Sequence, residues 1–202
     1  MNAVESSKPD QPINDLIANR WSPYAFSEVA VPEDDLQALF EAARWAPSSS
    51  NEQPWCYIVA TKSEPTEFER VLSCLVPQNQ AWAKAAPVLA IGCTRLKFAG
   101  NGQPNAHALH DLGLASANIC LEATARGICV HQMAGILPDK AREVFQIPAD
   151  AQAVTGIAIG YAADPAAAPA ELRDRDKARR GRKPLAEFLF TGKWQAISKL
   201  AE

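Results

Sequence analysis

Apolar residues along the chain follow two patterns, the three-to-four residue spacing of helices and the short continuous runs of buried strands. Helical spacing predicts helices that begin near positions 11, 33, 65, 107 and 138. Continuous apolar runs predict strands over 55–61, 86–93, 128–136 and 151–163. No repeat or obvious linker divides the chain, so we expect a single mixed domain over 11–202 after a flexible, polar N-terminus over 1–10.

The segment 107–126 is the longest predicted helix, and apolar residues occur on nearly all of its faces. These residues are Leu109, Leu112, Leu114, Ala115, Ala117, Ile119, Cys120, Leu121 and Ala123. A helix of this kind must be buried, and in a chain of this size total burial indicates a core shared with a second subunit. Gly127 is expected to end the helix.

The loop between the second helix and the first strand has the sequence A-P-S-S-S-N-E-Q-P-W over 46–55. Pro47 disfavours helical geometry before it, and Pro54 removes a backbone donor just before the strand. Three hydroxyls and two carboxamides lie between the prolines, which suits a neutral heteroaromatic or polyol ligand. The alternative is an ordinary Ser/Asn turn.

Composition and charge exclude several classes of protein. With 202 residues and a formal net charge of −3, the chain has no basic field that would attract nucleic acid. No apolar run reaches the roughly 20 residues of a membrane-spanning helix, and the N-terminus lacks the apolar core of a signal peptide. We therefore expect no nucleic-acid partner, no membrane insertion and a cytoplasmic location.

Metal and nucleophile motifs are missing from the sequence. The five cysteines are widely spaced without a C-x-x-C pair, and His107 and His110 have no third ligand nearby. P-loop, G-x-G-x-x-G, G-x-S-x-G and H-E-x-x-H patterns are also absent. We expect no metal site, and we assign no catalytic side chain. His131, on a strand without an evident partner, is interpreted as structural.

Two short segments could bind a phosphate. Arg20 and Ser22 are two residues apart, so a guanidinium fork and a hydroxyl can both reach one phosphate. A second basic run, R-R-G-R-K over 179–183, contains Arg180 and Arg182. Taken alone, each segment is more typical of a solvated surface.

Five segments occur in an order that resembles the nitroreductase family, whose members hold FMN. They are Arg-x-Ser at 20–22, the decapeptide at 46–55, an asparagine at 79, H-Q-M-A-G at 131–135 and R-x-R-K-P-L at 180–185. The decapeptide and H-Q-M-A-G are fairly specific, whereas the two arginine segments are weak alone. The resemblance covers about residues 14–194, and D-x-G-x-A-x-x-N over 111–118 adds to it.

The resemblance implies a cofactor site made from these segments. Arg20, Ser22, Arg180 and Arg182 would anchor the FMN phosphate, Ser48, Ser49, Asn51 and Asn79 would contact the ring and ribityl chain, and backbone donors over 133–135 would face the ring. The full set of expected FMN-binding residues is Arg20, Trp21, Ser22, Tyr24, Pro47, Ser48, Ser49, Ser50, Asn51, Asn79, Met133, Ala134, Gly135, Arg180 and Arg182.

Position 24 departs from the family pattern. The resemblance implies a lysine or arginine there, where positive charge stabilises the reduced flavin, but this chain has Tyr24. A phenol donates one hydrogen bond and brings no full charge. We therefore expect a reduction potential that differs from the family's usual one.

The resemblance also implies the fold and the activity. The fold is expected to be α+β, a mixed, mainly antiparallel sheet flanked by helices in an intertwined homodimer, with the extension 164–202 wrapping the partner subunit. The activity would be reduction of a small aromatic acceptor by NADH or NADPH, through hydride transfer at flavin N5. A flavin-storage protein without turnover, or another flavin chemistry such as dehalogenation or enal reduction, is the alternative.

Overall fold

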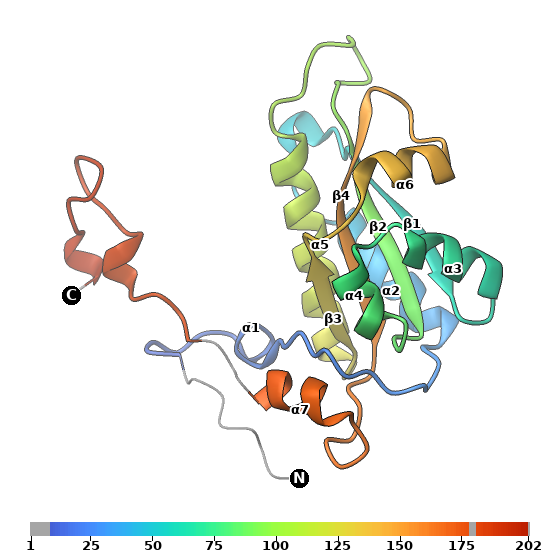
Figure 1. Cartoon of the computed structure of the whole chain (residues 1–202). Helices are drawn as coiled ribbons and strands as arrows, with labels where there is room; N and C mark the ends of the chain where they lie inside the picture. The colour runs from blue at the N-terminus through green and yellow to red at the C-terminus, as the bar shows by residue number, and fades with distance from the viewer. Residues whose placement is uncertain (1–8, 178–180, 202) are drawn as a thin grey trace.

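The computed structural model describes residues 9–177 and 181–201, and its centre is a four-stranded sheet (Figure 1). The strands are β1 Trp55–Thr61, β2 Val88–Arg95, β3 Cys129–Met133 and β4 Ala151–Gly160, in the order β1-β2-β4-β3. All three pairings are antiparallel. The expected α+β class and the mainly antiparallel sheet are confirmed, and no parallel pair occurs among the strands of the described residues.

The described residues form seven α-helices. They are α1 Asp15–Asn19, α2 Glu33–Arg44, α3 Pro65–Ser73, α4 Pro77–Ala83, α5 Ala108–Ala125, α6 Pro138–Phe145 and α7 Ala170–Lys177 within the described ranges, with 3-10 turns η1 Ser49–Asn51, η2 Leu185–Glu187 and η3 Lys199–Ala201. Proline occupies the first turn of α3, α4 and α6, where its fixed φ and missing donor are tolerated. The sequence pattern missed α4 and α7.

The sheet separates two hydrophobic cores. Helices α2 and α5 cover one face, and α3, α4 and α6 cover the other (Figure 1). Strand β2 supplies both cores by alternation, because Val88 and Ala90 pack beneath α5 while Leu89 and Ile91 pack on the opposite side. The central strand is therefore buried on both faces.

Helix α5 is confirmed as the longest helix, but a single chain buries only part of its surface. Leu112 and Ile119 are buried against the sheet, whereas Leu109 is 51% exposed and Ala117 is also exposed. Gly127 follows the helix with φ +70°, the left-handed conformation that glycine adopts easily. The total burial of α5 that its sequence predicts is therefore not seen within one chain.

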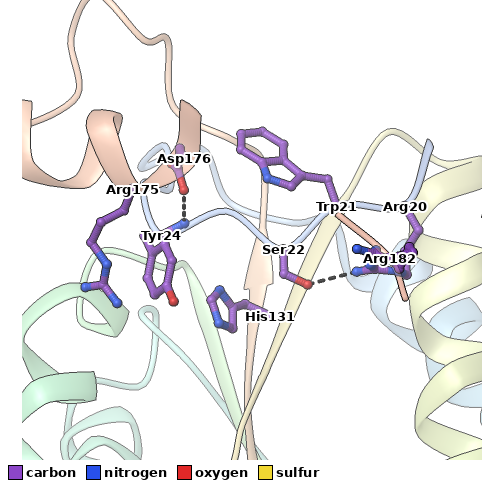
Figure 2. Close-up of a pocket in the computed structure, with 8 residues that line it drawn as sticks. All are labelled: Arg20, Trp21, Ser22, Tyr24, His131, Arg175, Asp176 and Arg182. Atoms are coloured by element: carbon purple, nitrogen blue, oxygen red, sulfur yellow. Dashed lines mark hydrogen bonds between the residues drawn. The ribbon is translucent and has the colours of Figure 1, made fainter. Parts of the chain in front are cut away.

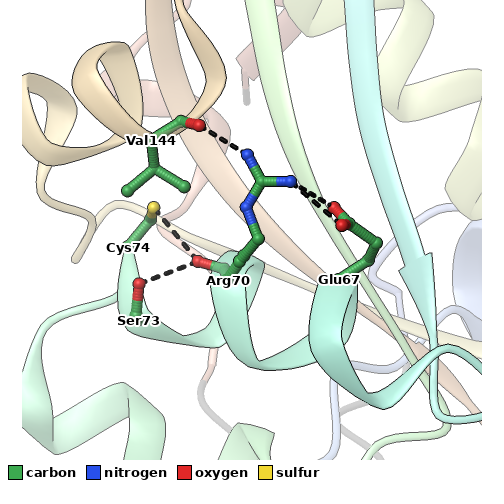
Figure 3. Close-up of polar contacts among 5 residues, drawn as sticks. All are labelled: Glu67, Arg70, Ser73, Cys74 and Val144. Carbon is green, nitrogen blue, oxygen red and sulfur yellow. Dashed lines mark hydrogen bonds and ion pairs between the residues drawn. The ribbon is translucent and has the colours of Figure 1, made fainter.

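A polar network joins α3 to α6 on the second face of the sheet (Figure 3). Arg70 donates to the carbonyl oxygen of Val144 at 2.6 Å and to both oxygens of Glu67, and its guanidinium lies 4.9 Å from the ring centre of Phe145. The carbonyl of Arg70 itself accepts from the hydroxyl of Ser73 at 2.8 Å. These contacts fix α6 on α3.

The C-terminal part of the chain leaves the sheet. After α7, residues 181–201 extend away from the layered body (Figure 1). This C-terminal segment exposes large apolar side chains, among them Phe188 at 58% and Trp194 at 82%. Of the helices in the described residues, none has the length and apolar character needed to span a membrane.

Candidate functional site

The segment that follows α1 carries the first predicted anchors. Residues 20–26 run in an extended path past β3 to the end of β4, where Phe26 bridges to Ala162. Arg20 donates through Nη1 to the hydroxyl oxygen of Ser22 at 2.9 Å, and that hydroxyl donates to the carbonyl of Val130 on β3 at 3.0 Å. Strand β3 therefore fixes the serine, and the serine fixes the guanidinium.

A cavity of about 400 Å³ opens beside this segment (Figure 2). Its lining residues are Arg20, Trp21, Ser22, Tyr24, His131, Arg175, Asp176 and Arg182. Three guanidinium groups face a single carboxylate, so the cavity has a surplus of positive charge that suits an anion. We call this space the arginine cavity. It brings together five of the expected FMN-binding residues, Arg20, Trp21, Ser22, Tyr24 and Arg182, and their contact with FMN stays a prediction.

Helix α7 closes one side of the arginine cavity. The carboxylate of Asp176 accepts from the backbone N–H of Tyr24 at 2.7 Å and of Ala25 at 3.1 Å. The guanidinium carbon of Arg175 lies 3.6 Å from the centre of the Tyr24 ring. The sequence pattern missed both residues, because they belong to a charged run that is typical of a solvated surface.

His131 lies at the floor of the arginine cavity. Its Nδ1 is 2.8 Å from the carbonyl oxygen of Pro23, and because that oxygen only accepts, Nδ1 carries the proton. The imidazole also contacts the rings of Tyr24 and Trp82, with centres 4.7 and 4.5 Å away. These contacts give His131 a structural role, in agreement with its interpretation from the sequence.

An apolar cavity of about 480 Å³ adjoins the arginine cavity, since the two share Arg20, Ser22 and His131. Its other lining residues are Ile17, Ala117, Cys120, Leu121 and Gln132, from α1, α5 and β3. Burial raises the pKa of the Cys120 thiol, so the thiol stays protonated near neutral pH and is a poor nucleophile. Both volumes lie within the range of about 300–1,000 Å³ usual for small-molecule sites.

Residues 47–49 of the loop 47–51 line a different cavity, of about 340 Å³, at the start of α5. Pro47, Ser48 and Ser49 lie there with Asp111, whose buried carboxylate accepts from the backbone N–H of Ser49 at 3.1 Å. The loop is unusual in its backbone, because Ser50 and Asn51 both have φ of 54°. Within one chain, Pro47, Ser48 and Ser49 therefore do not reach the arginine cavity.

Asn79 and Gly135 form a third group. The Asn79 amide donates to the carbonyl of Gly135 at 3.0 Å, and its oxygen accepts from the indole N–H of Trp82 at 3.3 Å. A Cβ on Gly135 would stand 2.5 Å from Nδ2 of Asn79 and 2.8 Å from a methyl of Val76. The glycine therefore makes room for α4, and a contact of Asn79 or Gly135 with FMN stays a prediction.

The remaining predicted residues are placed as follows. Met133 is buried and ends β3, Ala134 is exposed directly after it, and Ser50 and Asn51 are exposed at η1. Arg180 lies outside the described residues. In the part of the chain that the structure describes, no three His, Cys, Asp or Glu side chains are grouped to hold a metal ion.

The donor set of the arginine cavity fits a phosphate monoester. Arg20 and Arg182 supply charge and several N–H donors for the phosphate, and the Tyr24 ring in the same cavity and the adjoining apolar cavity offer surfaces beside which a flat ring can lie. A cationic anchor next to aromatic and apolar surface matches the chemistry of FMN.

Several known proteins resemble this chain in sequence and in fold. A crystal structure of an oxidoreductase containing FMN superposes with a TM-score of 0.88 at 32% identity, covering 97% of this chain and 99% of that one. An uncharacterised 15.4 kDa protein of Mycolicibacterium smegmatis is 31% identical over 61% of this chain and 82% of its own. A protein of Archaeoglobus fulgidus, provisionally named NADH dehydrogenase/NAD(P)H nitroreductase, is 27% identical over 74% of this chain and 84% of its own.

The model of the Nitroreductase family matches residues 17–161, which includes the Arg-x-Ser segment, the decapeptide loop and H-Q-M-A-G. That match spans well over half of the chain. The chain therefore belongs to the nitroreductase family.

Proposed function

We propose that the protein is an FMN-dependent oxidoreductase that uses NADH or NADPH to reduce a small organic acceptor, such as a nitroaromatic or a quinone. The observation that carries the proposal is the convergence of Arg20, Ser22 and Arg182 on one cavity, although they lie near opposite ends of the chain. The FMN named for the 32% identical relative supports the choice of cofactor.

Each anchor has a distinct role in the proposed site. The guanidinium of Arg20 has five N–H donors, so its bond to Ser22 leaves others for the phosphate. The Ser22 hydroxyl hydrogen already bonds the Val130 carbonyl, so Ser22 orients Arg20 rather than donating to the phosphate itself. Arg182 adds a second positive charge from the C-terminal segment.

When bound, FMN supplies two-electron transfer through N5 of its ring. The chain's own residues bind and orient the reactants. Ile17, Ala117 and Leu121 offer an apolar surface beside the cationic anchors, on which nicotinamide and then the acceptor can stack in turn. This shared surface is consistent with a ping-pong order.

We further propose that the working form is a homodimer in which loop 47–51 of a second copy completes the site. Within one chain, residues 47–49 of this loop line a cavity that contains neither Arg20 nor Arg182. The exposed side of α5 and the exposed apolar residues of the C-terminal segment are surfaces that a second copy would cover.

Spectroscopy and turnover test the proposal. The purified protein is expected to be yellow, and NADH or NADPH added without oxygen is expected to bleach the flavin band. Steady-state oxidation of NAD(P)H with a quinone or a nitroaromatic separates an oxidoreductase from a flavin-storage protein, which would bind FMN without turnover. A colourless protein that takes up no added FMN would contradict the proposal.

A further inference from the structure

Helix α7 presents two neighbouring side chains to the arginine cavity, Asp176 and Arg175, and Asp176 fixes the helix. Both oxygens of Asp176 accept backbone N–H groups, from Tyr24 and from Ala25. Hydrogen bonds to an ionised acceptor are stronger than neutral ones. The carboxylate is therefore committed to the backbone, and α7 is held against the segment that carries Tyr24.

The second side chain, Arg175, delivers a positive charge above Tyr24. Its guanidinium carbon is 3.6 Å from the centre of the phenol ring, a distance typical of a cation–π contact. The ring is itself held by edge contacts with His131 at 4.7 Å and with Trp82 at 5.2 Å between centres. Arg175 thus has a defined place, although its side chain is exposed.

The cavity consequently has two cationic ends. Figure 2 shows Arg20 and Arg182 together on one side, Arg175 with Tyr24 on the other, and Ser22 and His131 between them. One phosphate can occupy only one of these ends, and the pair of guanidinium groups of Arg20 and Arg182 makes theirs the better anchor. The second end is suited to another electron-rich group of the same bound molecule.

We propose that Arg175 supplies the positive charge that stabilises the reduced form of the flavin. Tyr24 cannot supply this charge itself, because its phenol is neutral. This inference rests on the proposed function. Transfer of a hydride from NAD(P)H adds two electrons and one proton to the neutral ring, so the ring gains one negative charge and NAD(P)⁺ leaves. A cation nearby favours the charged form.

The test compares Arg175→Gln with the wild type and with Lys177→Gln. Lys177 is a matched control, because it is an exposed cation on the same helix that pairs with Asp174 and does not line the cavity. Dissociation constants of oxidised and reduced FMN are measured for each protein, together with the midpoint potential of the bound flavin.

In Arg175→Gln we expect oxidised FMN to bind within about threefold of wild type and reduced FMN to bind about tenfold more weakly. For a two-electron couple a tenfold change lowers the potential by about 30 mV. Lys177→Gln is expected to match the wild type, and Tyr24→Lys added to Arg175→Gln is expected to restore the potential, since it returns a charge beside the same position.

Two results for Arg175→Gln would overturn the inference while leaving the proposed function intact. One is an unchanged potential in Arg175→Gln with FMN bound; the other is an equal loss of oxidised and reduced FMN, which would make Arg175 a general anchor. Absence of FMN from the wild type would overturn both. Arg175→Lys, which keeps the charge, is expected to stay near the wild-type potential, and a potential as low as that of Arg175→Gln would also contradict the inference.

Discussion

At the scale of single residues, the site depends on how one side chain orients another. Ser22 accepts from Arg20 and donates to Val130, so the guanidinium is held by the backbone of β3 through one hydroxyl. A bond from a charged donor contributes about 1.5–3 kcal/mol. The anchor for the phosphate is therefore preorganised before any ligand arrives.

Ser22→Ala is expected to weaken FMN binding about tenfold, because Arg20 loses its partner and must be ordered on binding. Ser22→Thr keeps the hydroxyl and is expected to retain most of the affinity. A fluorescence titration with FMN measures both variants, with Ser73→Ala on α3 as the control for loss of a hydroxyl. Equal affinities of Ser22→Ala and the wild type would remove Ser22 from the site.

The raised pKa values of a thiol and a phenol in the interior predict how the free energy of unfolding depends on pH. Burial raises the pKa of Cys93 to about 11 and of Tyr57 to about 12. In the folded protein the pKa of Cys93 lies above its value of about 8.5 in the unfolded chain. The protonated, buried thiol therefore stabilises the folded protein fully below pH 8.5, and this contribution is lost as the pH rises toward 11. Denaturant unfolding at pH 7.5, 9 and 10.5 should show a falling free energy of unfolding.

The decline should be shallower in Cys93→Ala than in the wild type, because the variant lacks the thiol whose pKa is raised by burial. In the native protein at pH 8, alkylation of Cys93 should also be slow, because the thiol is protonated and inaccessible. A free energy of unfolding that rises between pH 9 and 10.5 would contradict this assignment.

At the scale of elements, periodic apolar residues predicted most of the fold, and the short helices α4 and α7 were missed. β2 and α5 were found because their apolar residues fill the cores. Helix α7 has no buried residue and docks through Asp176, whose bonds to backbone N–H groups leave no periodic trace in the sequence. The same reason hid Arg175 and its place over Tyr24.

The docking of α7 gives a prediction at this scale. Asp176→Asn removes the charge from both N–H bonds and leaves one good acceptor, so amide hydrogen exchange of Tyr24 and Ala25 is expected to accelerate about tenfold. Asp174→Asn, on the same helix with an exposed side chain, is the control and should leave both amides unchanged. Unaltered exchange in Asp176→Asn would show that α7 is held by other contacts.

At the scale of the whole molecule, the predicted residues fall into groups that one chain does not join. Arg20, Ser22 and Arg182 line the arginine cavity, while Pro47 and Ser49 line another at the start of α5. The sequence motifs identify both groups but carry no information on which chain supplies each. A second copy that packs on α5 is our proposal for joining them.

Gly113→Glu tests this proposal on the exposed side of α5. A Cβ at Gly113 meets no atom within 4 Å in the described chain, and Glu favours a helix more than Gly does, so the monomer should fold. The wild type is expected to show twice the mass of one chain in sedimentation, and Gly113→Glu is expected to shift toward a single chain with loss of FMN. Gly100→Glu, also in open space, is the matched control. A monomeric wild type that binds FMN would contradict the proposal.

The most direct test of the account is an FMN titration of the wild type against the double variant Arg20→Ala with Arg182→Ala, followed by calorimetry. Removing two charged donors from one phosphate is expected to weaken binding by at least about a hundredfold, while Lys97→Ala, an exposed cation in a loop outside the arginine cavity, leaves it unchanged. The same dissociation constant in the wild type and the double variant would contradict the assignment of the arginine cavity as the flavin site.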